Sequence, residues 1–173
     1  GDLGAARRTY QRAEQLLDAT PWDPEAAMAV GGQAITYELE QRWQDALSHY
    51  HRANELFASR AAETPAYAAR YLRGEALALL ELGRPGEALT VARRVTAASA
   101  RYGARETGAA RFVIARAHLA LGQRDAALAE AETALGELRG EHLDAKAHVM
   151  AIEAWLAELR PDRPSQRPVQ IRG

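Results

Sequence analysis

One short pattern returns along the chain at nearly even spacing, and this repetition limits the fold more than any other feature. The pattern is a turn followed by an acidic residue and an alanine, as in residues 83–88 (GRPGEA). The marker alanines are Ala6, Ala46, Ala88 and Ala127, which lie 40, 42 and 39 residues apart. A fixed period of about 20–50 residues is typical of repeat architectures, in which stacked units share a continuous core.

Each marker alanine stands near the start of a helical pattern. The fourth and seventh residues after the marker are small, aromatic or apolar in every copy: Tyr10, Tyr50, Ala92 and Ala131, then Ala13, Ala53, Val95 and Ala134. Offsets of four and seven lie on one helical face. Twelve residues before the marker a small residue recurs, followed three positions later by a larger one: Ala34 and Tyr37, Ala76 and Leu79, Ala115 and His118. These spacings predict pairs of helices joined by a turn and crossing closely at the small residues.

The positions of proline and glycine divide the chain into helices. Asp23-Pro24 and Thr64-Pro65 place a capping side chain before a proline, which suits the first turn of a helix. Gly83 and Gly122 stand where a left-handed residue would end one helix before a tight turn. We predict no sheet and eight helices, over residues 3–19, 24–40, 43–60, 65–82, 85–101, 105–121, 124–139 and 143–159.

The order of these residues resembles the tetratricopeptide repeat (TPR). That repeat has a small residue in its first helix, an aromatic or leucine three positions later, a glycine at the turn, and then Ala, an aromatic and Ala in its second helix. Residues 76–83 (ALALLELG) match the first half, and Ala46, Tyr50 and Ala53 match the second. The resemblance implies an all-α fold, a right-handed α-solenoid of about eight helices in antiparallel pairs, over residues 1–159. Residues 160–173, which are rich in proline and arginine, are expected to form a flexible tail.

The spacing near 40 residues is longer than the period of about 34 residues in the common repeat. The longer form is similar to the helical-repeat regions of large bacterial transcription regulators that carry an ATP-binding module and a DNA-binding domain. The resemblance implies that such repeats bind a partner protein or an inducer. The chain begins at Gly1, and residues 1–4 (GDLG) resemble the middle of a repeat. We therefore expect the chain to be a piece of a longer protein.

Several classes of function find no support in the composition. Lys and Arg total 22 against 23 Asp and Glu, so no excess of positive charge favours direct binding to nucleic acid. The chain has no cysteine, and no two of its five histidines are four residues apart, so we expect no metal site. No phosphate loop or nucleophile motif occurs, which predicts a non-enzyme with no catalytic residues and no cofactor. No apolar run is long enough to span a bilayer, so we expect no membrane partner and a cytoplasmic location.

The resemblance also implies a concave groove lined by the first helix of each pair. The positions expected to face this groove are Met28, Gly31, Ile35, Glu38, Arg70, Arg73, Leu77, Leu80, Ala109, Phe112, Arg116 and Leu119. We take seven of them as candidate partner-binding residues: Ile35, Glu38, Arg70, Arg73, Leu77, Phe112 and Arg116. Their arginines suit bidentate contact with a carboxylate or phosphate of a partner. The alternative is that these arginines pair with nearby acids such as Glu75 or Glu106.

The expected function is therefore that of a scaffold module that binds a protein or peptide in its groove, within a bacterial regulatory or assembly protein. The first helix lacks its pair, so self-association through this N-terminal helix is a further expectation. The alternative function is a small-molecule or inducer-sensing domain of a transcription regulator, which a deep closed pocket would favour.

Overall fold

The computed structural model describes residues 2–17, 24–58, 65–140 and 145–159. Within these ranges there are eight helices and no strand. The helices are α1 (Leu3–Leu17), α2 (Pro24–Leu39), α3 (Trp43–Ala58), α4 (Pro65–Glu81), α5 (Pro85–Ala97), α6 (Ser99–Ala120), α7 (Arg124–Arg139) and α8 (Lys146–Leu159). The predicted tail, and the capping residues Asp23 and Thr64, lie outside the described residues.

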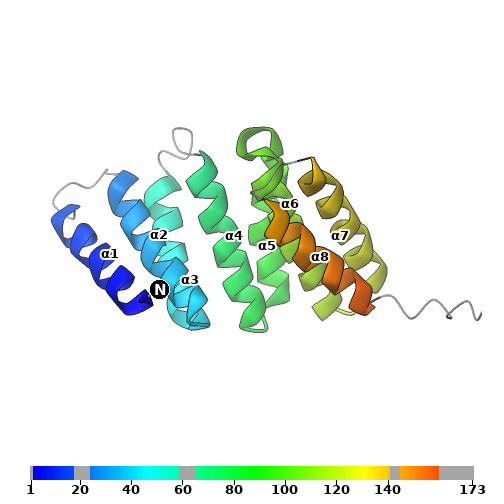
Figure 1. Cartoon of the computed structure of the whole chain (residues 1–173), viewed down its shortest axis with the longest axis horizontal. Helices are drawn as coiled ribbons and strands as arrows, with labels where there is room; N and C mark the ends of the chain where they lie inside the picture. Colours follow the sequence, from blue (N-terminus) through cyan, green and yellow to red (C-terminus); the bar gives the residue numbers. More distant parts are fainter. Residues whose placement is uncertain (1, 18–23, 59–64, 141–144, 160–173) are drawn as a thin grey trace, which may run out of the picture.

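The helices stack side by side along one axis (Figure 1). Each helix packs against the next one in sequence, and α4 also packs against α2 and α6. The helices α2, α4 and α6 therefore form one layer, which we call the inner layer, and α3, α5 and α7 lie beside it. This arrangement confirms the predicted all-α stack of paired helices.

Small residues occupy the helix crossings, as their spacing predicts. The six aligned alanines of the three complete pairs are all 0% exposed: Ala34, Ala76, Ala115, Ala46, Ala88 and Ala127. A methyl group lets two helix axes approach closely, and larger neighbours such as Tyr50, Phe57 and Leu138 fill the space between crossings. The repeat in the sequence is thus a repeat of core packing.

Three turns that join paired helices share one backbone geometry. Gln41, Gly83 and Gly122, each five residues before a marker alanine, have φ angles of 57°, 74° and 75°. In each turn the N–H of this residue donates to the carbonyl three residues earlier, and the next N–H donates to the carbonyl five residues earlier, at 2.9 or 3.0 Å. This is the Schellman pattern that ends a helix. The predicted caps at Gly83 and Gly122 are confirmed.

In two of these turns the side chains on either side also touch. The guanidinium of Arg42 lies 4.6 Å from the centre of the Tyr37 ring. At the equivalent place, Nδ1 of His118 lies within hydrogen-bond distance of Oε1 of Gln123. His118 therefore fills the position predicted for it, with a hydrogen bond to the residue just after the turn.

Replacing Gln41 with glycine should raise the free energy of unfolding by about 0.5–1 kcal/mol. A left-handed conformation costs a residue with a Cβ about 1–2 kcal/mol, and the greater freedom of glycine in the unfolded chain offsets part of the gain. Urea unfolding measures the change. The reverse replacement in the equivalent turn, Gly83→Gln, should lower stability, and equal stability of Gln41→Gly and wild type would contradict the assigned geometry.

The predicted interruption between residues 101 and 105 is present, with a shifted boundary. Helix α5 ends at Ala97, four residues before the predicted end, and α6 begins at Ser99. Gly103 then breaks the helical backbone of α6 with φ 79° and ψ 162°. Only glycine adopts these angles without strain, so the local break follows from a single residue.

Candidate functional site

Two adjacent glycines in α2 allow aromatic rings to pack directly on its backbone. A Cβ on Gly31 would lie 2.2 Å from Cζ of Tyr71 in α4, and a Cβ on Gly32 would lie 2.5 Å from Cε1 of Tyr10 in α1. The prediction that Gly31 faces an open groove was therefore wrong, because Tyr71 covers it. Ala109 was also placed wrongly, since only 4% of it is exposed.

The same rings form the walls of an open depression of about 560 Å³ between α1, α2 and α4. Met28 and Ile35 of α2 contribute apolar surface on either side of the glycine pair. The rings of Tyr10 and Tyr67 are 38% and 39% exposed, so they offer aromatic surface to a ligand. We call this feature the α1–α2–α4 depression; its lining is Tyr10, Ala13, Leu17, Glu25, Met28, Ala29, Gly32, Ile35, Tyr67, Arg70 and Tyr71.

Arg70 is the one arginine in the lining of this depression, and it is half-buried. Within the described part of the chain, no carboxylate forms an ion pair or hydrogen bond with its guanidinium. Its charge is felt by the neighbouring ring: burial raises the pKa of Tyr71 to about 12, and the positive charge of Arg70 opposes that rise. Arg70, which has no ion-pair partner among the described residues, therefore brings a positive charge to a surface that is aromatic and aliphatic apart from Glu25.

The other two candidate arginines already have acidic partners. Nε of Arg73 lies 3.6 Å from Oε2 of Glu106, and the guanidinium of Arg116 forms an ion pair with Glu81. The alternative of internal pairing thus applies to Arg73 and Arg116, and the sequence correctly named Glu106 as an acid for this role. Glu75, the other acid considered, is hydrogen-bonded instead by side chains of α3.

The remaining candidates are spread over the stack. Glu38 accepts a short hydrogen bond from the Tyr50 hydroxyl, and burial together with Glu38 raises the pKa of that hydroxyl above its ordinary range. Leu77 packs on the core cluster of α4, α5 and α6. Phe112 packs edge-on against Trp155 of α8, with ring centres 5.5 Å apart. Of the seven candidates, the structure brings Ile35 and Arg70 into one depression.

The two exposed tyrosines of the depression, Tyr10 and Tyr67, are not among the candidate partner-binding residues predicted from the sequence. Tyr10 occupies the fourth position after its marker alanine, where Tyr50 is buried at 2% exposure. Among the described helices, α1 packs mainly against α2, whereas α3, which carries Tyr50, packs against both α2 and α4. Tyr67 lies outside the repeat pattern, and no spacing in the sequence points to it.

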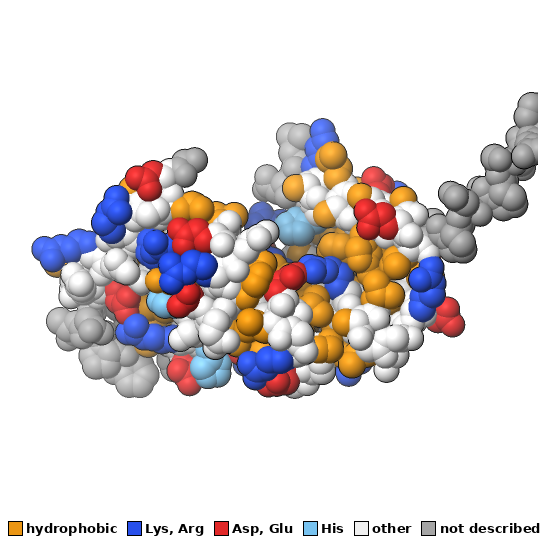
Figure 2. Space-filling model, turned by 90° about the horizontal axis from the view of Figure 1, so that it is seen from below, with side chains coloured by type: hydrophobic (Ala, Val, Ile, Leu, Met, Phe, Trp, Pro, Cys, Tyr) orange, Lys and Arg blue, Asp and Glu red, His pale blue; other side chains and the backbone are white. Residues whose placement is uncertain are grey.

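A polar cluster continues across the inner layer from the depression. Besides Arg73, Glu106 pairs with Arg105, whose Nη2 lies 3.3 Å away. Within the described part of the chain, Nε of Arg73 and Nδ1 of His148 are both buried without a hydrogen-bond partner. Figure 2 shows an indentation in the outline of the molecule, with histidine, acidic and basic side chains beside it.

Acidification should destabilise the fold through His148. Burial lowers the pKa of His148, and the positive charge of Arg73 lowers it further. The negative charge of Glu106 raises this pKa by less than the other two effects lower it. The unfolded chain therefore binds the proton more readily, so stability falls as the pH drops below the ordinary histidine value of about 6.5. Urea unfolding at pH 7.5 and 5.5 should show a smaller loss for His148→Gln than for wild type, and equal losses would contradict this assignment.

The described helices thus form a solenoid-like stack with an open depression between α1, α2 and α4. No protein-family model matches the chain, and no curated protein matches it. Among the described helices, none is long and apolar enough to cross a membrane. The described residues also contain no group of three or more potential metal ligands.

Proposed function

We propose that this chain is a non-enzymatic, tetratricopeptide-type module that binds a protein or peptide segment. The observation that carries the proposal is the α1–α2–α4 depression, where the guanidinium of Arg70, unpaired among the described residues, lies with the exposed rings of Tyr10 and Tyr67 and the half-buried Met28 and Ile35. We further propose that the module belongs to a cytoplasmic regulatory or assembly protein of bacterial type, on the strength of the repeat spacing in the sequence.

The lining of the depression specifies the partner's chemistry. An apolar side chain of the partner would be buried against Met28, Ile35 and Tyr67, and each 100 Å² of apolar surface removed from water contributes about 2.5 kcal/mol. A carboxylate next to that side chain would accept charge-assisted hydrogen bonds from Arg70, which contribute about 1.5–3 kcal/mol. The partner segment is therefore expected to pair an aromatic or aliphatic residue with an acidic group.

The second candidate function is a small-molecule or inducer sensor. A volume of about 560 Å³ lies within the usual range for small-ligand sites, which is the observation in its favour. The depression is open along the helix layer, and this openness favours an extended segment over an enclosed small molecule.

Selection from a displayed library of random peptides tests the proposal and the partner chemistry together. We expect wild-type protein to enrich peptides that carry an acidic residue or a free C-terminal carboxylate beside an aromatic or aliphatic residue. Arg70→Gln should weaken binding of the selected peptides by at least tenfold, because Gln keeps the length of the side chain but lacks the charge.

Arg116→Gln is the matched control, since Arg116 is also a half-buried arginine of the inner layer but is paired with Glu81. It should leave peptide affinity unchanged. Enrichment of no peptide, or equal loss of affinity in both variants, would contradict the proposal, and the first of these outcomes would favour the sensor.

A further inference from the structure

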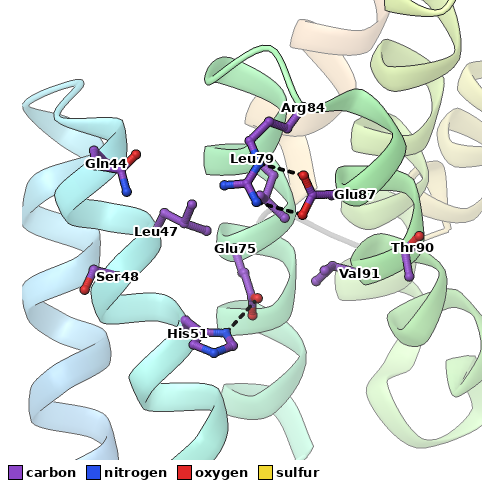
Figure 3. Close-up of a pocket in the computed structure, with 10 residues that line it drawn as sticks. All are labelled: Gln44, Leu47, Ser48, His51, Glu75, Leu79, Arg84, Glu87, Thr90 and Val91. Atoms are coloured by element: carbon purple, nitrogen blue, oxygen red, sulfur yellow. Dashed lines mark hydrogen bonds and ion pairs between the residues drawn. The ribbon is translucent and has the colours of Figure 1, made fainter.

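A second cleft lies between α3 and α5 and is also lined by residues of α4. It shares no lining residue with the α1–α2–α4 depression. Figure 3 shows its side chains converging from α3, α4 and α5. Its volume is about 520 Å³, within the range of small-ligand sites. Leu47, Leu79 and Val91 supply apolar walls, and Glu75 lines the cleft beside them with its carboxylate directed toward His51. We call this feature the α3–α5 cleft.

The charged groups at the rim of the α3–α5 cleft neutralise one another. Nε and Nη2 of Arg84 donate to the two carboxylate oxygens of Glu87, both at 2.7 Å. This bidentate pair leaves no net charge at the rim. The electrostatic character of the cleft therefore depends on Glu75.

Glu75 is a buried carboxylate without a permanent cation beside it. Its side chain is 9% exposed, and it accepts hydrogen bonds from Nδ2 of Asn54 at 2.6 Å and from Nδ1 of His51 at 3.2 Å. An amide and a neutral imidazole can make both bonds. No lysine or arginine among the described residues forms an ion pair with Glu75. Burying a charge is costly unless an opposite charge compensates it.

The preceding repeat shows the same arrangement with the charge compensated. Gln33 and Glu75 occupy equivalent positions, each directly before an aligned alanine, and Gln33 donates to Glu14 at 2.6 Å. Here the carboxylate is on α1 and the amide is on α2. In the next junction the amide, Asn54, is on α3 and the carboxylate, Glu75, is on α4. Glu14 also forms an ion pair with Arg52. Among the described residues, Glu75 thus has no ion pair with a lysine or arginine equivalent to the one between Glu14 and Arg52.

We propose that the α3–α5 cleft binds a primary alkylammonium group. The ammonium would contact Glu75, and its aliphatic chain would lie along Leu47, Leu79 and Val91. Because Oε2 of Glu75 is already engaged by Asn54, the free acceptor capacity is mainly on Oε1, which has only the 3.2 Å contact. A single acceptor suits the compact ammonium better than the two-pronged guanidinium of arginine.

Methyl NMR titrations of the whole chain with n-pentylammonium test this proposal. The methyl signals of Leu47, Leu79 and Val91 should shift saturably, whereas n-pentanol and pentanoate at the same concentrations should cause no such shifts. These ligand controls do not depend on the folding of any variant. Nα-acetyl-lysine N-methylamide, run in parallel, separates the two sources: tighter binding than n-pentylammonium indicates a lysine side chain, and weaker binding a free amine.

Two variants locate the interaction. Glu75→Gln keeps an acceptor for Asn54 but removes the charge, and it should weaken n-pentylammonium binding at least tenfold with unchanged helicity. Glu55→Gln, which alters a second neighbour of His51 outside the cleft, should bind as wild type does. Absence of saturable shifts with n-pentylammonium, similar shifts with n-pentanol, or full affinity in Glu75→Gln would overturn the proposal. Arg70→Gln should have no effect here, so this test is independent of the peptide proposal.

Discussion

Replacing Gly74 with alanine is expected to lower the free energy of unfolding by about 3 kcal/mol. Gly74 lies in α4, and a Cβ there would be 2.3 Å from Cζ of Tyr50. The ring cannot move away easily, because Tyr50 is 2% exposed and its hydroxyl donates to Glu38. Inserting atoms into a packed core costs about 1–3 kcal/mol and sometimes more, and the closeness of this contact places the cost at the upper end.

Gly136→Ala is the matched control for Gly74→Ala. Gly136 also lies inside a helix, but beyond the neighbouring backbone of that helix a Cβ there would meet no described atom within 4 Å. Alanine is the better helix former by about 0.8–1 kcal/mol, so this variant should be more stable than wild type. Opposite signs in urea unfolding are the expected result. A Gly74→Ala variant as stable as wild type would show that Tyr50 does not pack on the α4 backbone.

Replacing Arg73 with methionine is expected to destabilise the fold by about 2–3 kcal/mol. The side chains of Arg73 and Glu106 are 17% and 10% exposed, so both charges are largely removed from water. Removing one partner of a buried pair leaves the other charge uncompensated, at a cost of about 3–5 kcal/mol. Arg105 also pairs with Glu106, which reduces the expected loss.

A second substitution separates charge from packing at this site. Adding Glu106→Gln to Arg73→Met removes the stranded carboxylate, and at least half of the lost stability should return. The double variant and both single variants, measured by urea unfolding at pH 7.5, form a double-mutant cycle. Additive losses would contradict an energetic link between α4 and α6 through this pair.

The helices could be predicted from the sequence because their ends carry local information. Proline at the first turn of α5 and the glycines after α4 and α6 act through backbone geometry alone, so no tertiary contact is needed to recognise them. The turn at Gln41 shows the limit of such local information. It has the same left-handed geometry without glycine, and only its alignment with Gly83 and Gly122 indicates it.

The candidate site was less predictable because pairing depends on how neighbouring helices are aligned along the stack. Arg70 and Arg73 are three residues apart on α4, and the sequence offers no reason to treat them differently. The structure places Arg73 beside Glu106 of α6 and leaves Arg70 facing the depression. Gly31 was assigned to the groove because helical periodicity shows on which face of the helix a residue lies. Periodicity does not show that a ring from another helix, here Tyr71, covers that face.

Paired changes in side-chain size explain how the repeat tolerates variation. Tyr10 on Gly32 and Tyr50 on Gly74 are equivalent ring-on-glycine contacts in the first two junctions. In the third, the aromatic position holds Ala92, and the larger Val113 occupies the glycine position in the same core cluster. The volume is thus moved from one helix to its neighbour, which keeps the packing filled.

The most direct test of the proposed function is to map a selected peptide onto the surface by methyl NMR. Binding in the α1–α2–α4 depression predicts saturable shifts of the Met28 and Ile35 methyl signals, with those of Leu47 and Val91 in the other cleft unchanged. The affinity should fall at least tenfold in Arg70→Gln and stay the same in Arg116→Gln. Shifts that leave Met28 and Ile35 unaffected, or equal affinity of Arg70→Gln and wild type, would contradict the proposed binding surface.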